Sequence, residues 1–209
     1  MKHLKALIPA SLLLTAIACG DDEEVEEAGE EVITTLTLTF TPVDGGAPVV
    51  ATFRDPDGDG SGAATQFDDI VLVSGTTYGL ELVALNETVD PTDPDYRIID
   101  EITEEAEEHQ FFFHGPAVES DTTGANPNAL VVVSYEDLES DYVSSASEPD
   151  LPVGVLNTVV TSTTGSVAEG FRVTLKHQPP NGGVPVKTET SGLNDGGTDV
   201  DVAFDLTVQ

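Results

Sequence analysis

A regular alternation of apolar and polar residues at both ends of the folded region limits what this chain can form. In "VITTLTLTF" (residues 32–40) apolar residues alternate with threonine, and in "DVDVAFDLTVQ" (199–209) they alternate mostly with polar residues, placing Asp199, Asp201 and Asp205 on the polar side. Side chains of a β-strand point alternately to its two faces. Both segments are therefore predicted to be strands with one buried face and one solvent-facing face.

Similar short runs recur between these two segments, separated by turn sequences such as "DGG", "TTGSVAEG" and "NGG". We expect about eight or nine strands in an all-β fold, a single antiparallel β-sandwich of the Ig-like or Greek-key type. A β-barrel is the alternative. The intermediate strands are predicted at residues 48–54, 70–73, 77–85, 110–114, 129–135, 155–162 and 170–178.

One stretch favours a short helix, immediately before the segment "HQFFFH". Ile98, Ile102 and Ala106 recur every four residues, Asp100 is a suitable N-cap, and glutamate and alanine are good helix formers. The sequence predicts about two helical turns, followed by a strand that begins near His109.

The N-terminus predicts export and a lipid anchor. Residues 1–18 combine two lysines, a short apolar run and the small residues that a signal peptidase accepts. Cleavage after Ala18 leaves Cys19, the only cysteine, as the first residue, which resembles the lipobox of bacterial lipoproteins and implies acylation of the thiol. Residues 19–31 carry eight acids and no base, which is typical of a disordered tether, and residues 32–209 form the expected β-sandwich domain.

Several longer segments resemble a group of small acidic lipoproteins, mainly from Bacteroidetes, that are often labelled "type 1 periplasmic binding fold superfamily protein". The resemblance rests on "VITTLTLTF", "ATFRDPDGDGSGAA", "TTYGLELVALNET", "DEITEEAEEHQFFF", "FRVTLKHQP" and "GGTDVDVAFDLTVQ". It implies an outer-membrane lipoprotein without an established activity. The fold named in that label is α/β, whereas the alternation in this chain predicts an all-β domain.

The net charge of −32 excludes nucleic acid as a partner, because phosphate binding needs clustered Lys and Arg. A saline habitat is one explanation for such acidity. The chain has no G-x-S-x-G, H-E-x-x-H or phosphate-binding glycine loop, so we expect no enzymatic activity. The sequence favours a binding or accessory module at the cell surface or in the periplasm, beside an outer-membrane transport protein. A purely structural surface lipoprotein is the alternative, and secretion without an anchor is the alternative for its location.

The segment "DPDGDGSG" resembles the start of a calcium-binding loop. Asp55, Asp57 and Asp59 stand at alternate positions with Gly60 after them, so their oxygens can converge on one hard cation. The twelfth position of such a loop is Gln66 instead of an acid. The sequence predicts weak calcium binding here, with an ordinary acidic turn as the alternative.

The histidines suggest a transition-metal site. His177 ends an alternating strand on its apolar face, and His109 begins the strand 109–114. If those strands are antiparallel neighbours, the two rings meet at one rim of the sandwich. Together with Glu105 or Glu108 they form a set of ligands suited to zinc and tolerable to copper or nickel, and His114 is a weaker candidate. In the alternative, both histidines are rim residues that hydrogen-bond to protein groups.

Overall fold

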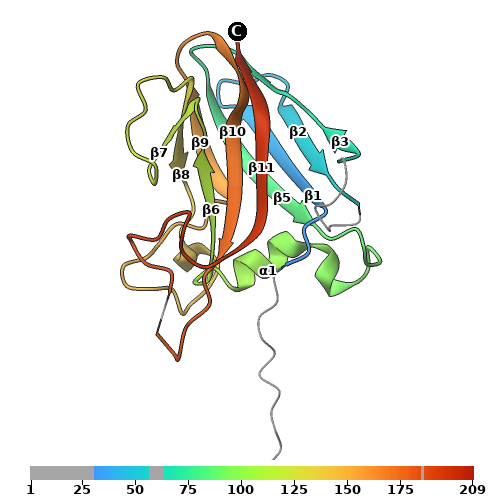
Figure 1. The fold of residues 1–209 in the computed structure, drawn as a ribbon, viewed down its shortest axis with the longest axis vertical. Coiled ribbons are helices and arrows are strands. Elements are labelled where there is room, and N and C mark those ends of the chain that lie inside the picture. The colour runs from blue at the N-terminus through green and yellow to red at the C-terminus, as the bar shows by residue number, and fades with distance from the viewer. Residues whose placement is uncertain (1–30, 57–63, 185) are drawn as a thin grey trace, which may run out of the picture.

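The computed structural model describes residues 31–56, 64–184 and 186–209, which form two β-sheets packed face to face (Figure 1). The strands are β1 (Thr35–Pro42), β2 (Val49–Arg54), β3 (Gln66–Phe67), β4 (Ile70–Leu72), β5 (Thr77–Leu85), β6 (His109–His114), β7 (Val118–Ser120), β8 (Val131–Tyr135), β9 (Leu156–Thr161), β10 (Gly165–His177) and β11 (Gly197–Val208). The predicted all-β sandwich is confirmed. The short strands β3 and β7 were not expected.

The larger sheet has the strand order β3-β2-β1-β5-β9-β8-β7, and the smaller sheet has the order β4-β11-β10-β6. Most neighbours are antiparallel, as predicted. The pairs β4–β11 and β7–β8 are parallel, so the short edge strands β4 and β7 depart from the antiparallel arrangement.

The core lies between the sheets and follows the alternation seen in the sequence. Leu36, Leu38 and Phe40 of β1 are fully buried, and Phe171 of β10 meets them from the other sheet. The rings of Phe40 and Phe171 pack edge to face with centroids 5.9 Å apart. Aromatic pairs in this arrangement add to the free energy gained by burying apolar surface. The inward positions of both sheets thus join one hydrophobic cluster.

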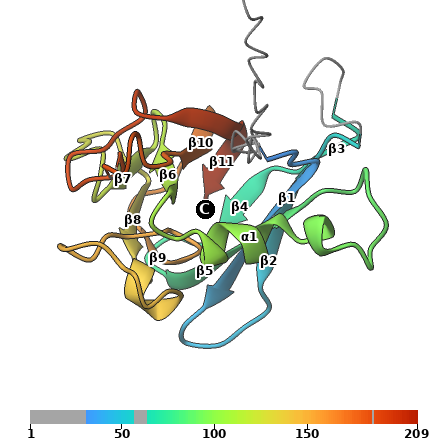
Figure 2. The same ribbon diagram turned by 90° about the horizontal axis from the view of Figure 1, so that it is seen from below.

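Helix α1 (Ile98–Glu104) covers one end of the sandwich, where Figure 2 shows it crossing between the two sheets. Its apolar residues Ile98, Ile99 and Ile102 are buried against that end. This packing explains why a helix forms here although many of its residues are acidic. The helix starts earlier than predicted: Arg97 is its N-cap, and Asp100 pairs with Arg97 instead of capping. Two single turns of 3-10 helix also occur, at Pro94–Tyr96 and Glu139–Asp141.

Candidate metal centre

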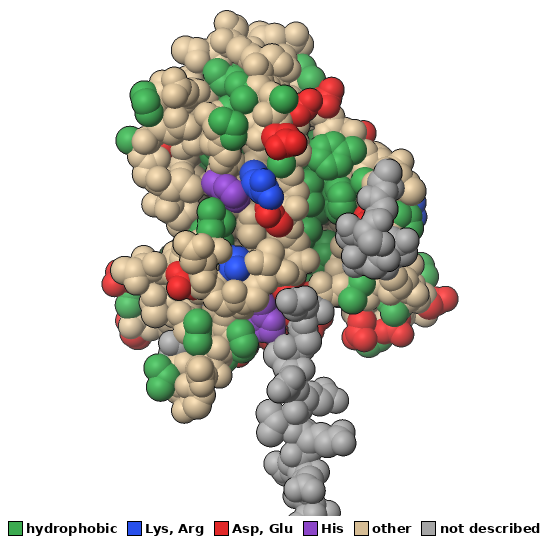
Figure 3. Space-filling model, viewed as in Figure 1, with side chains coloured by type: hydrophobic (Ala, Val, Ile, Leu, Met, Phe, Trp, Pro, Cys, Tyr) green, Lys and Arg blue, Asp and Glu red, His purple; other side chains and the backbone are tan. Residues whose placement is uncertain are grey.

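The covered end of the sandwich is where the polar groups of interest gather. Strands β1, β6 and β11 begin there, and β10 ends there beside α1 (Figure 1). The space-filling view in Figure 3 shows histidine at this lower end of the molecule and, separately, further up the same face.

Two histidines face each other at this end because β6 and β10 pair antiparallel. The register places His177 opposite His109, with Leu175 opposite Phe111 next to them. Both histidines share the inward side with these core residues, and their side chains are 5% and 0% exposed. The rings stack with centroids 4.4 Å apart and planes inclined by 17°. The expected meeting of His109 and His177 is therefore confirmed, whereas metal binding stays a prediction.

Glu31 is the carboxylate on which both rings converge. Its Oε1 atom lies 3.0 Å from Nε2 of His109 and 3.7 Å from Nδ1 of His177. On its other side, Nδ1 of His109 lies 3.2 Å from the carbonyl oxygen of Glu105. A carbonyl only accepts, so Nδ1 carries the proton and donates it. Nε2 then faces a carboxylate that only accepts, so without metal it carries a second proton and donates to Glu31, and a metal ion would take the place of that proton while the Nδ1 hydrogen bond holds the ring.

Sequence reasoning missed Glu31, because it ends an acidic run and was assigned to the tether of residues 19–31. Its side chain is only 4% exposed, so the folded domain begins at least one residue earlier than predicted. Burial alone raises a carboxyl pKa, but the hydrogen bond and charge of His109 outweigh it and lower the pKa of Glu31 to about 2. Burial lowers the pKa of His109, and the hydrogen bond and charge of Glu31 reverse this to a net increase.

The two predicted carboxylates lie beside the rings but play different parts. Glu105 is the exposed C-cap of α1, and one of its carboxylate oxygens belongs to a group of donor atoms, from Glu31, Glu105, His109 and His177, that all lie within 4.8 Å of one another. Oε2 of Glu108 is 3.5 Å from Nε2 of His177. The structure thus brings all four predicted residues to one place, although α1 ends before Glu105.

Asp199 is a second group that the alternation placed wrongly. We expected it on the solvent-facing side of its strand, but both of its carboxylate oxygens are buried. The pairing of β10 with β11 shifts register here: Leu175 is opposite Val200, while Lys176 is opposite Thr198. Asp199 is therefore the unmatched residue of a β-bulge, and bulges redirect side chains in this way. Burial, and then the charge of Glu31, raises the pKa of Asp199 to about 8.

Six buried polar atoms at this end have no hydrogen-bond partner of normal geometry among the described residues: Oε2 of Glu31, Nε2 of His177, Oδ1 and Oδ2 of Asp199, and Oε1 and Nε2 of Gln178. Buried polar groups are rarely left in this state. Two ionised carboxylates cannot donate to each other, whereas a protonated Asp199 can donate to Glu31. What would satisfy them is a cation, either a shared proton or a metal ion.

The remaining predicted residues lie elsewhere. His114, at the far end of β6, is opposite Arg172, and its Nε2 contacts Oγ1 of Thr174 at 2.9 Å, so it takes no part in the cluster. Asp55 is buried, and its backbone N–H donates to the carbonyl of Thr34. The predictions for Asp57, Asp59, Cys19 and the signal peptide of residues 1–18 concern residues outside the described ranges.

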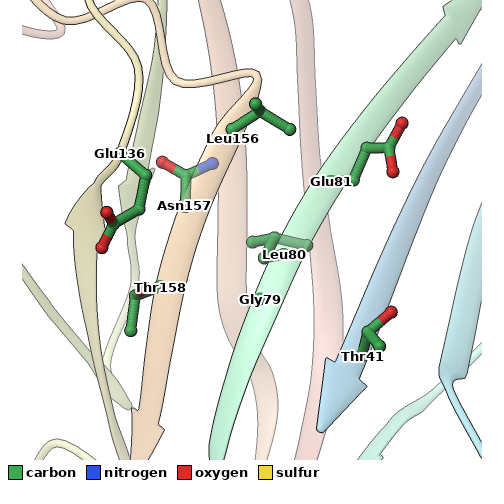
Figure 4. A pocket seen from close by; sticks show the side chains of 8 residues that line it. All are labelled: Thr41, Gly79, Leu80, Glu81, Glu136, Leu156, Asn157 and Thr158. Atoms are coloured by element: carbon green, nitrogen blue, oxygen red, sulfur yellow. The ribbon is translucent and has the colours of Figure 1, made fainter. Parts of the chain in front are cut away.

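A separate hollow of about 340 Å³ lies on strands β1, β5 and β9 (Figure 4). Figure 4 shows the side chains of Glu81 and Glu136 on opposite sides of it, with Asn157 and Thr158 nearer its floor. The hollow is wide open, and no cationic or aromatic side chain lines it. It lacks the convergence of donors seen at the covered end.

Within the described ranges, no helix has the length and apolar character needed to cross a membrane. Comparison of the chain with family models, curated proteins and solved structures finds no match. The fold and the site are therefore interpreted from the chain's own residues.

Proposed function

We propose that this protein binds a divalent transition-metal ion at the covered end of its β-sandwich, as a binding or accessory module and not as an enzyme. The ligands are His109, His177 and Glu31, with Glu105 as a further carboxylate. The observation that carries the proposal is the convergence of two buried imidazoles on one buried carboxylate oxygen, with His109 fixed by the carbonyl of Glu105.

The kind and spacing of these donors favour zinc. Two imidazole nitrogens and carboxylate oxygens suit Zn²⁺, and also Cu²⁺ or Ni²⁺, whereas none of the grouped donors is a thiolate. Zinc bonds of about 2.0–2.2 Å hold tetrahedral ligand atoms roughly 3.3–3.6 Å apart. The present spread of up to 4.8 Å needs only a small inward movement of the side chains. The carboxylates nearby offset the charge of the ion.

The calorimetric test is a titration with Zn²⁺ at neutral pH. We expect a saturable site with one ion per chain, and at least about tenfold weaker binding in His109→Ala and in His177→Ala, since each removes a ligand. His114→Ala is the matched control and should bind as the wild type does, because its ring contacts Thr174. Equal, weak binding by all four proteins would mean that zinc is only attracted to the acidic surface.

A structural role is the second candidate, and the ion pair itself favours it. A protonated His109 and an ionised Glu31 stabilise each other without any metal, as the opposite changes in their pKa values indicate. In that case the pair only fastens the start of the domain to the first residue of β6. The titration above distinguishes the two, because a structural pair predicts no saturable zinc site.

We further propose that the protein is an exported lipoprotein, anchored through acylated Cys19 in the outer membrane and acting near a transport protein. The signal-like residues 1–18 and the acidic segment 19–31 support this. Radioactive palmitate should label the wild type and not Cys19→Ser, and protease added to intact cells should remove the labelled protein. Unlabelled protein would mean ordinary secretion, and labelled but protected protein would mean a periplasm-facing anchor. Weak calcium binding by Asp55, Asp57 and Asp59 stays a prediction.

A further inference from the structure

We propose that Asp199 is an additional ligand of the metal ion, so that the site takes its donors from four separate segments of the chain. The inference rests on the proposed zinc site. It adds a residue that the alternation in the sequence assigns to the solvent-facing side of β11. The donors would be Glu31 before β1, His109 at the start of β6, His177 at the end of β10 and Asp199 near the start of β11.

The first support is the position of Asp199. The bulge opposite Leu175 and Lys176 leaves Asp199 without a partner in the register. Lys176 is paired with Thr198 across the two strands, and its Nζ donates to Oγ1 of Thr198 at 2.7 Å. The redirected carboxyl group instead lies next to Glu31, and its charge acts on His109. It therefore faces the donor cluster and not the solvent-facing side of the sheet.

The second support is the absence of donors for this carboxylate. Both oxygens of Asp199 and Oε2 of Glu31 are buried without a hydrogen-bond partner of normal geometry in the described part of the chain. Two ionised carboxylates side by side would repel each other, and after burial this repulsion is a cause of the raised pKa of Asp199. A divalent ion between them and the two imidazoles would replace the proton as the partner that the carboxylates share, and two carboxylates balance its charge.

Another aspartate of β11 shows that the lack of donors at Asp199 depends on its position in the strand. Asp201 lies two residues further along β11 and forms a bidentate ion pair with Arg172, with Oδ1 2.6 Å from Nε. It also accepts from Oγ1 of Thr174 at 2.9 Å. Asp201 therefore has a guanidinium and a hydroxyl as donors, whereas no cationic or hydroxyl side chain among the described residues donates to Asp199, which interacts only with Glu31 and the nearby charge of His109.

A ligand at Asp199 would join β11 to the residue that precedes β1. Glu31 is the first described residue, so metal binding would fasten the start of the domain to both long strands of the smaller sheet. A metal ion whose donors come together only in the folded chain stabilises that chain, by a free energy that grows with the ratio of the free-ion concentration to Kd.

The test compares Asp199→Asn with Asp201→Asn in the full mature chain. We expect Asp199→Asn to bind Zn²⁺ at least about tenfold more weakly than the wild type, and Asp201→Asn to bind it nearly as tightly. Without metal, Asp199→Asn should melt at nearly the same temperature as the wild type at neutral pH, because burial beside Glu31 raises the pKa of Asp199 to about 8 and the neutral amide resembles the protonated carboxyl group that it replaces. A residue with a merely structural role would instead lower the melting temperature.

Three outcomes decide the matter. Weaker zinc binding by Asp199→Asn alone, with its apo form intact by circular dichroism, supports the proposal. Unchanged binding by Asp199→Asn, while His109→Ala loses it, would overturn the role of Asp199 and leave the zinc site standing. Absence of saturable binding in the wild type would overturn both.

Discussion

Single residues at the covered end show how little freedom the local backbone has. Gly196 precedes β11 with a φ of 75°, a conformation that favours glycine. A Cβ atom added there would overlap the carbonyl oxygen of His177 and press on the side chain of Gln178. The close approach of the two segments therefore fixes the end of β10, and with it the position of the His177 ring.

Replacing Gly196 should therefore damage both the fold and the site. We expect Gly196→Ala to lower the free energy of unfolding by about 1–3 kcal/mol, from backbone strain and from the overlap with His177. Gly192→Ala is the control: it lies in the same loop, has no positive φ, and an added Cβ meets nothing within 4 Å. Urea unfolding of both variants measures the difference, and equal stabilities would contradict this account of the turn.

The histidines of the candidate site could be predicted from the sequence, whereas its central carboxylate could not. His109 and His177 could be found because strand alternation and antiparallel pairing suffice to bring them together. Glu31 could not, because nothing in an acidic run distinguishes the one residue that folds inward. The available signal for such a residue was an inward-facing histidine with no predicted partner. A buried imidazole needs a polar partner, so an unidentified polar group had to lie nearby.

At the level of elements, periodicity predicted most strands and missed their irregularities. The long strands β1, β5 and β11 follow the alternation over most of their length, since half their side chains enter one core, whereas β10 is interrupted by two register shifts and is buried on both faces near its end. The strands β3 and β7 have only two and three residues, too short for any period to be recognised. Their pairing depends on neighbours distant in sequence.

The bulge in the β10–β11 pair is the irregularity with the largest consequence. A period of two assigns every odd residue of β11 to the solvent side, and one unmatched residue is enough to break that assignment for Asp199. The bulge depends on how two strands 20 or so residues apart meet, as well as on the turn through Gly196. Sequence reasoning on either strand alone does not contain that information.

At the level of the whole molecule, one hydrophobic cluster joins both sheets and α1, and the candidate site lies at its edge. The buried ion pair between Lys187 and Glu139, 2.9 Å apart, lies in the same region, where Nζ of Lys187 also donates to the carbonyl of Ala106 after α1. These contacts hold the loop after β10 against the helix. The site is thus built on packed elements, as precise metal coordination requires.

Anomalous X-ray diffraction at the zinc absorption edge, from crystals of the zinc-loaded protein, tests the central claim most directly. We predict one strong anomalous peak between His109, His177 and Glu31, within about 2.0–2.2 Å of their donor atoms after refinement. The same data set shows whether Asp199 is bound to the ion. A map with no peak there, or with peaks only at exposed acidic side chains, would contradict the account and leave His109 and Glu31 as a structural ion pair.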